Sequence, residues 1–168
     1  MMHYKKGRNV EEELKAENIP IDVLPENYLW MHVRGGTKIP NVIDFVKTAF
    51  EKGEYRSVVW SGSGGGVVKT ISCAEIFKRN TNLNQVTRLS YRVVDEYWEP
   101  QMEGLEEIVA SRKVPCIHIL QTLDAVNSKT LGYQPANEKT KFWASKSKQP
   151  DARTAVKGGG GEGGSANK

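Results

Sequence analysis

The distribution of apolar and polar residues along the chain predicts two amphipathic helices. Apolar residues recur every three or four positions over residues 39–50 and again over residues 67–79, and charged residues fill the positions between them. This spacing is typical of a helix that buries one face. Pro40 suits the first turn of the first helix, where a missing amide proton has no cost, and Gly53 suits its C-terminal end.

Short runs of β-forming residues flank these helices. Residues 28–33 and 56–60 are compact runs that end at glycine-containing turns, and residues 85–98 and 114–122 predict two longer strands joined by an acidic loop. A strand-helix-strand crossover makes a parallel pair, whereas the last two strands can pair as an antiparallel hairpin. The sequence therefore predicts an α/β (α+β) fold of order β-α-β-α-β-β, a two-layer sandwich of a mixed four-stranded sheet with both helices on one face.

The two ends of the chain lack this periodicity. Residues 1–27 mix charges with prolines, so we expect a flexible N-terminal segment with at most one weak helical turn at residues 11–16. Residues 28–126 are the expected folded domain, and residues 127–168 predict a disordered Gly/Ser/Lys-rich tail. The apolar runs are too short to cross a bilayer, and the N-terminus lacks a secretory pattern, so no membrane partner is expected.

Charge and chemistry narrow the function further. The net charge is +4, and the tail carries eight lysine and arginine residues against three acidic ones, which favours an anionic partner. Cys73 and Cys116 lie in apolar patterns without a metal-binding spacing, and His3, His32 and His118 have no nucleophile at a useful distance in the sequence. We therefore expect no metal, no cofactor and no catalytic residue.

The glycine-rich turn before the second helix is the main candidate site. Glycines let backbone amides approach an anion, and the following helix contributes the positive end of its dipole. A dinucleotide fingerprint would need glycine in place of Val67, and a P-loop would need glycine in place of Val68, so both enzyme motifs fail. A tight turn without any ligand remains an alternative. The turn consists of Ser61, Gly62, Ser63, Gly64, Gly65 and Gly66.

Three cations can join this turn. Both helices of a strand-helix-strand unit begin at the same sheet edge, so Arg34, Lys38 and Lys69 are expected to lie near the glycines. Taken alone, each lysine is more often a solvated surface charge. Taken together with two helix N-termini, they suit a run of phosphates better than one small anion. Four aromatic residues are interpreted as core or interface residues rather than base-stacking platforms, namely Trp30, Trp60, Tyr91 and Tyr97.

Three segments resemble the Alba superfamily, and they read RGGTKIPNVIDFV, VVWSGSGGGVVKTISCAEIFKR and GYQP. Within it, they resemble the larger Alba-type subunit of eukaryotic nuclear ribonuclease P and RNase MRP, or its close paralogue. The resemblance covers residues 29–135 and implies the fold predicted above. It also implies a non-catalytic RNA-binding subunit that supports tRNA 5′-leader processing and rRNA processing, because RNA is the catalytic component of those enzymes.

The resemblance further implies partners and site residues. The expected partners are the ribonuclease P or MRP RNA, a smaller Alba-type subunit in a heterodimer, and other ribonucleoprotein subunits, in the nucleus and its nucleolus. Lys38 and Lys69 match basic positions that contact nucleic acid, and residues 62–66 match the turn beside them. Acidic residues crowd the predicted hairpin, where Arg112 and Lys113 are the basic patch that remains.

Three other functions stay open at this point. The chain could be a general Alba-type RNA- or DNA-binding protein that acts as a homodimer in mRNA regulation or chromatin. It could be a small phosphate-handling enzyme built on the glycine turn, although the motif tests argue against this. It could also be an assembly module whose hairpin and second helix bind protein, because interface and core residues look alike in a sequence.

Overall fold

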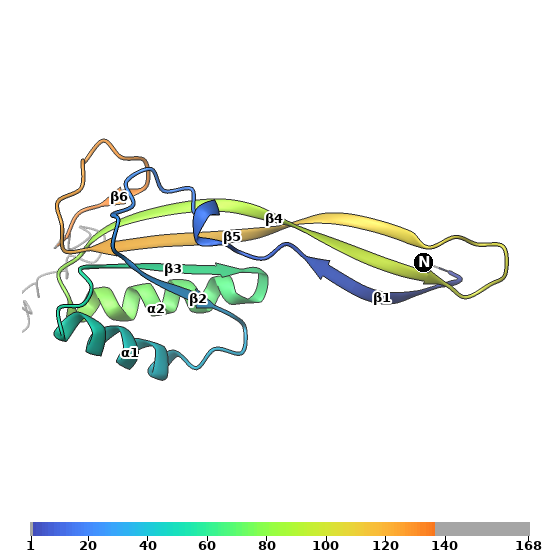
Figure 1. The fold of residues 1–168 in the computed structure, drawn as a ribbon, viewed down its shortest axis with the longest axis horizontal. Coiled ribbons are helices and arrows are strands. Elements are labelled where there is room, and N and C mark those ends of the chain that lie inside the picture. The colour runs from blue at the N-terminus through green and yellow to red at the C-terminus, as the bar shows by residue number, and fades with distance from the viewer. Residues whose placement is uncertain (1, 137–168) are drawn as a thin grey trace, which may run out of the picture. The chain divides into compact units, whose positions relative to one another are not determined.

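The computed structural model describes residues 2–136, so residues 137–168 of the tail predicted at residues 127–168 lie outside the described residues. Two α-helices and six strands are present within the described range, together with 3-10 turns at Ala16–Asn18 and Gly64–Gly66 (Figure 1). In chain order the strands and helices are β1 (Tyr4–Glu11), β2 (Leu29–Val33), α1 (Ile39–Glu51), β3 (Ser57–Ser63), α2 (Val67–Asn80), β4 (Asn84–Pro100), β5 (Ile108–Thr122) and β6 (Tyr133–Gln134).

The strands form one mixed sheet in the order β1-β4-β5-β3-β2, and β6 also pairs with β4. Strands β2 and β3 are parallel, as the helical crossover between them requires, and the remaining pairs are antiparallel. Both helices lie on the same side of the sheet (Figure 1). The predicted α+β fold, with two helices and a mixed sheet, is therefore confirmed, and β1 and β6 extend the sheet beyond the four predicted strands.

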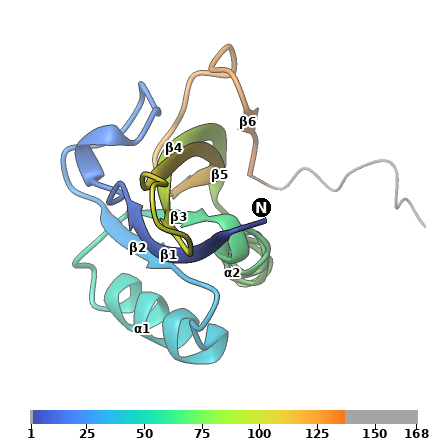
Figure 2. The same cartoon turned by 90° about the vertical axis from the view of Figure 1, so that its right-hand side faces the viewer.

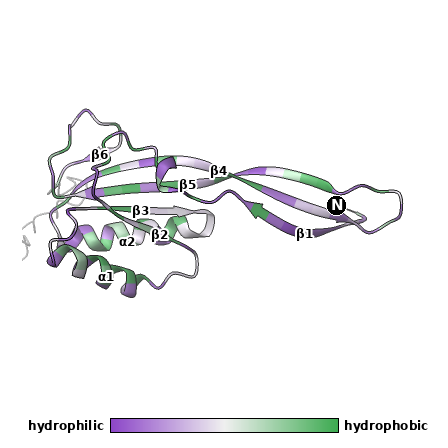
Figure 3. Ribbon diagram, in the orientation of Figure 1, coloured by the Kyte–Doolittle hydropathy of each residue, from purple (hydrophilic) through white to green (hydrophobic). Residues whose placement is uncertain are grey.

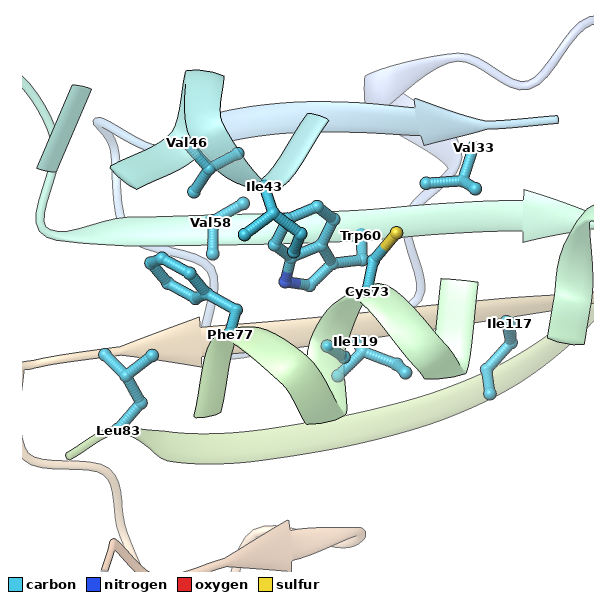
Figure 4. Close-up of a cluster of buried hydrophobic side chains, with 11 residues drawn as sticks. Val33, Ile43, Val46, Val58, Trp60, Cys73, Phe77, Leu83, Ile117 and Ile119 are labelled. Atoms are coloured by element: carbon cyan, nitrogen blue, oxygen red, sulfur yellow. The ribbon is translucent and has the colours of Figure 1, made fainter. Parts of the chain in front are cut away.

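The main core lies between the helices and the sheet, where the apolar stripe of each helix meets alternate residues of β2, β3 and β5 (Figure 4). Trp60 lies at its centre, and its ring meets Phe77 edge-on at a centroid distance of 5.9 Å. The buried indole Nε1 of Trp60 donates a hydrogen bond to Gln121 Oε1 at 2.9 Å, and Gln121 Nε2 donates to Ala74 O at 2.8 Å. The side-chain polar atoms of Trp60 and Gln121 are thus paired, as burial requires.

The N-terminal segment differs from its expected form. Residues 4–11 form a strand on the edge of β4, and Ile19 and Ile21 are buried against Val59 on the face of the sheet opposite the helices. Figure 2 shows the part of this segment between β1 and β2 on the other side of the strands from the helices. Within the described part of the segment only these two isoleucines are buried, too few to produce a periodic pattern, which explains why the sequence suggested a flexible lead-in.

The start of the predicted tail is also ordered in the structure. Residues 133–134 form β6 on the inner part of β4, and Thr87 N donates a hydrogen bond to Gly132 O at 3.0 Å. Tyr133 joins the second apolar cluster beside Val86 and Leu120. The stretch that the composition assigned to a disordered tail therefore contributes a strand and an aromatic side chain to the fold.

Strands β4 and β5 continue well past the helices as a long hairpin. Their pairing runs from Asn84 opposite Thr122 to Trp98 opposite Ile108, so the connecting loop is shorter than predicted, at residues 101–107, and it still holds Glu103, Glu106 and Glu107. Strand β1 lies along the outer part of this hairpin and is mostly hydrophilic in Figure 3. The hairpin therefore forms a three-stranded arm, composed of β1 and the outer parts of β4 and β5.

Candidate nucleic-acid interface

The β2–α1 loop, residues 34–38, and the Gly64–Gly66 turn lie side by side at one edge of the sheet. Strands β2 and β3 pair in parallel as far as Val33 and Gly62, so their connections to the helices leave at the same end. A Cβ atom on Gly35 would lie 3.8 Å from Gly65 O, which shows how closely the two loops approach. The structure thus brings two helix N-termini to one surface.

Both helices begin without a side chain that caps their amides. Helix α1 follows Lys38 and helix α2 follows Gly66, and neither residue makes a side-chain cap hydrogen bond. The first N–H groups of a helix have no partner within the helix, and its N-terminus carries a partial positive charge. Each of these two ends can therefore bind a phosphate oxygen.

The predicted cations surround these loops. Arg34 and Lys38 are exposed, and neither side chain pairs with an acidic residue within the described range. Lys69 is half-buried and its Nζ donates a hydrogen bond to Thr37 O at 3.0 Å, so it ties α2 to the β2–α1 loop. The Thr37 hydroxyl oxygen also accepts a hydrogen bond from Arg34 N at 2.9 Å. Two exposed cations therefore lie beside one anchored cation.

The glycine-rich segment divides into a packed half and an open half. A Cβ on Gly62 would collide with Thr70 Oγ1, and one on Gly66 would collide with Val33 O, so both positions need glycine for packing. Gly64 and Gly65 are exposed, and Gly64 has a φ of +51°. The exposed part of the turn that an anion can reach therefore centres on Gly64 and Gly65.

Ser61 and Ser63 lie on β3 rather than in the predicted turn, because pairing with β5 continues as far as Ser63. Ser61 is buried, and its Oγ accepts a hydrogen bond from Trp30 Nε1 at 2.9 Å and lies 2.9 Å from His118 Nδ1. A phosphate at the surface cannot reach this hydroxyl. The turn accordingly begins at Gly64 in the structure, three residues later than the sequence suggested.

Comparison with known proteins identifies the family. The Alba family model matches residues 29–93. The chain is 38% identical over 138 residues to the human ribonuclease P protein subunit p25-like protein, covering 80% of this chain and 83% of that protein. The chain belongs to the Alba family.

Two further relatives match smaller parts of this Alba-family chain. It is 35% identical over 129 residues to the human ribonuclease P protein subunit p25, which covers 70% of this chain and 65% of that protein. It is 24% identical over 106 residues to the DNA/RNA-binding protein ALBA1 of Plasmodium falciparum, covering 62% and 43% of the two chains. The Alba match spans both loops of the candidate interface and ends within β4.

The two predicted cations of the hairpin have different surroundings in this Alba-family structure. Arg112 Nε lies 2.8 Å from Glu96 Oε1, which also accepts a hydrogen bond from Lys6 Nζ at 2.9 Å. The hydrogen bond from Lys6 and the charge of Arg112 lower the pKa of Glu96. Lys113 makes no ion pair with a described residue and precedes Val114, which lies against Gly64. Lys113 is therefore the hairpin cation next in the chain to a residue that contacts the glycine turn.

A cleft of about 570 Å³ beside the loops contains residues that the sequence analysis did not select. Its lining includes Arg34 and the glycine turn, but also Trp30, His32 and Arg92. Burial, then the charges of Arg34 and Arg92, lower the pKa of His32. Sequence alternation in β2 could have placed Trp30 and His32 on one face, but the cleft also depends on residues 11–14, whose position the sequence did not predict.

Reactive thiols, metal sites and membrane-spanning helices have little support in the described part of the chain. Both cysteines are buried, and burial raises the pKa of each thiol, so neither is a reactive thiolate. Residues 2–136 contain no group of three or more His, Cys, Asp or Glu side chains placed to hold a metal ion. Neither of the two described α-helices is long and apolar enough to cross a membrane.

Proposed function

We propose that this Alba-family chain is a non-catalytic RNA-binding subunit of a ribonuclease P or RNase MRP ribonucleoprotein. In this role it supports tRNA 5′-leader processing and rRNA processing in the nucleus, including the nucleolus. The observation that carries the proposal is the similarity to proteins named as ribonuclease P subunits, which extends over 80% of the chain and includes both basic loops.

The basic edge, formed by the β2–α1 loop and the glycine turn, is suited to an RNA backbone. Two uncapped helix N-termini and the cations Arg34, Lys38 and Lys69 offer several anion contacts within one surface. Such contacts fix a phosphate backbone in place without reading the sequence of its bases. Lys113 extends this surface toward the hairpin, whereas Arg112 shares the carboxylate of Glu96 with Lys6. We therefore assign RNA backbone contacts to Arg34, Lys38, Gly64, Gly65, Lys69 and Lys113.

An apolar surface on the helix side supports a protein partner. Leu89 lies directly opposite Ile117 across β4 and β5, so it shares the face of the sheet that the helices cover, yet it is 73% exposed. Tyr91, two residues on, is 70% exposed on the same face. A contiguous group of exposed apolar residues marks an interaction site in a soluble protein.

Helix α2 continues this apolar surface. Lys69 on one flank of α2 bonds to Thr37 beside α1, whereas Lys78 on the other flank donates to Gln134 of β6, which pairs with β4. Ile71 lies seven residues before Lys78 and therefore shares the flank that faces β4. We name Val68, Ile71, Leu89 and Tyr91 the pairing face, and we assign it to the smaller Alba-type subunit of a heterodimer.

Purification of the tagged full-length protein from nuclear extract tests this function. We expect ribonuclease P or MRP RNA to be enriched, together with a smaller Alba-type protein in equal amount. Recovery of a broad set of messenger RNAs or chromatin DNA, with a second copy of this chain, would instead establish the general nucleic-acid-binding alternative.

The contribution of the basic edge can be measured by the salt dependence of RNA binding. Each phosphate contact adds about 0.7 to 0.9 to the slope of log affinity against log salt. We expect Lys38→Ala to lower the slope by about that amount, because Lys38 is exposed and unpaired among the described residues. Lys52→Ala, at the other end of α1, is the matched control and should leave the slope unchanged. Equal slopes for the wild type and Lys38→Ala would contradict the assigned site.

A further inference from the structure

The cleft beside the basic loops lies on the side of the sheet opposite the helices. Its lining includes Glu11, Glu13 and Leu14, the end of β2, Gly65 and Gly66 of the glycine turn, and Arg92 of β4. Trp30 packs with the apolar cluster that faces away from the helices, which places the cleft on that side. Its volume, about 570 Å³, falls within the range typical of small-molecule sites. Arg34 and Gly65 belong to both the cleft and the proposed phosphate surface.

Two parallel aromatic rings line the cleft. The rings of Trp30 and His32 are parallel to within 4°, with centroids 6.1 Å apart. The hydrogen bond from Trp30 Nε1 to Ser61 Oγ holds the indole in place. Because the pKa of His32 is lowered, its ring is neutral near pH 7. A fixed, uncharged aromatic surface suits the π-face of a nucleobase, which RNA-binding proteins commonly recognise by stacking.

The charged groups of the cleft suit the edge of a base better than a second phosphate. Arg92 Nη2 lies 2.5 Å from Glu11 Oε2, so this pair is internally neutralised. The carboxylate of Glu13 makes no ion pair or side-chain hydrogen bond with a described residue, and it would repel a phosphate. A carboxylate is, however, a natural acceptor for the N–H donors of a base edge.

We propose that the cleft binds one unpaired nucleobase, preferably guanine, of the RNA strand whose phosphates lie on the basic loops. The base stacks on Trp30 and His32, and its N1–H and N2–H groups donate to the two oxygens of Glu13. Adenine and cytosine place a ring-nitrogen acceptor beside their amino group, and uracil has a single N–H between two carbonyls, so neither pattern matches a carboxylate as well. This inference rests on the proposed RNA-binding function.

The test uses the full-length protein and a set of RNA duplexes that are identical except at one bulged position. That position holds guanine, adenine, uracil or an abasic sugar, so the phosphate backbone stays the same. We expect the wild type to bind the guanine bulge about tenfold more tightly than the abasic bulge, as a bidentate base contact predicts. Glu13→Gln should lower this ratio without weakening the abasic complex, and the remaining preference reflects stacking on Trp30 and His32. Glu17→Gln, an exposed acidic residue outside the cleft lining, should preserve the ratio.

The outcomes separate this inference from the proposed function. Equal affinity of the wild type for guanine and abasic bulges, or an unchanged ratio in Glu13→Gln, would overturn the nucleobase site. If Lys38→Ala still weakens all four complexes equally, the proposed backbone surface stands on its own. Displacement of the RNA by guanosine monophosphate at a concentration near that of the protein would assign the cleft to a free nucleotide and also overturn the proposal.

Discussion

At the scale of single residues, glycines of one short segment serve different purposes. Gly62 lies on β3 with the Thr70 hydroxyl directly over its Cα, and it allows α2 to pack closely against the strand. Gly65 has no heavy atom within 4 Å of the position that a Cβ would occupy, so it leaves the turn open to solvent. Gly62 is therefore needed for packing, whereas Gly65 keeps the turn accessible to a ligand.

This division predicts different effects of two alanine substitutions. Gly62→Ala forces a methyl group against Thr70 and the carbonyl of Val33, and overpacking of this kind costs about 1 to 3 kcal/mol or more. Gly65→Ala should change the free energy of unfolding by less than about 0.5 kcal/mol, as surface substitutions usually do. Urea denaturation of both variants measures the difference. Equal stability would show that the strand tolerates a side chain at residue 62.

A buried histidine links stability to pH. His118 Nδ1 lies 2.9 Å from Ser61 Oγ, and its Nε2 lies 3.0 Å from Ser90 Oγ. A neutral imidazole has one N–H donor and one acceptor nitrogen, so with a neutral ring one of these two serine hydroxyls donates to His118 and the other accepts from it. This arrangement needs a neutral ring, and burial lowers the pKa of His118 below its ordinary value of 6.5.

The sign of the pH effect follows from proton binding in the two states. Below pH 6.5 the unfolded histidine takes up a proton that the folded one does not, until the pH reaches the lowered folded value. The free energy of unfolding should therefore fall by up to about 1.4 kcal/mol per pH unit in that window. Denaturation at pH 7.5 and pH 5.5 should show a smaller loss in His118→Gln than in the wild type. His3→Gln, at an exposed position, is the control, and an unchanged loss in His118→Gln would exclude His118 as the source.

The sequence predicted some of these residues and not others for a physical reason. The convergence of Arg34, Lys38 and Lys69 follows from the chain path. Strands β2 and β3 are parallel and each is followed by a helix, so both helices start at the same sheet edge. Ser61 lies on the strand rather than in the turn because β3 pairs with β5 as far as Ser63. No local sequence pattern encodes where that pairing ends. The cleft depends on the placement of residues 11–14, and this rests on contacts made far along the chain.

At the scale of elements, β1 shows what periodicity cannot detect. Its residues are mostly charged, polar or small, and its stabilisation comes from main-chain pairing with β4, the Lys6–Glu96 ion pair and Arg8 stacked 4.4 Å from the Tyr97 ring centroid. Helices α1 and α2, in contrast, bury apolar stripes that the sequence displays directly. A strand held by a neighbouring edge rather than by a core leaves no such signal.

Removal of β1 should expose the outer edge of β4 without unfolding the domain. We expect deletion of residues 1–11 to speed amide hydrogen exchange at least about tenfold in residues 94–100, where β1 pairs with β4. Residues 85–87 provide the internal control, because β6 and β5 flank them in both proteins. Mass spectrometry of the exchanged peptides reports both regions at once. If residues 94–100 exchange at the same rate in the wild type and in the deletion variant, β1 does not pair with β4 in solution.

At the scale of the folded region described by residues 2–136, the basic loops and the pairing face occupy different surfaces. The loops lie at the sheet edge where β2 and β3 end, whereas Leu89 and Tyr91 lie on the helix side of β4. An RNA bound at the first surface therefore leaves the second one available to a protein. Two such chains joined through their pairing faces would present two basic edges, which multiplies the number of phosphate contacts and the affinity for one RNA.

This arrangement predicts that a change far from the RNA weakens RNA binding through loss of the partner. Ile71→Asp places a charge on the pairing face, where it would be buried without a counterion in the heterodimer, so we expect affinity for the smaller Alba-type subunit to fall at least about tenfold. Phe45→Asp, on an exposed position of α1, is matched in chemistry and should leave the heterodimer intact. Light scattering gives the mass of each complex, and thermal unfolding checks that both variants fold. Because the single chain retains its own loops, Ile71→Asp should still bind RNA, but with a salt slope close to that of one basic edge. If Ile71→Asp forms the heterodimer with unchanged affinity, the protein interface does not include the pairing face, and the basic edge binds RNA without help from a partner bound there.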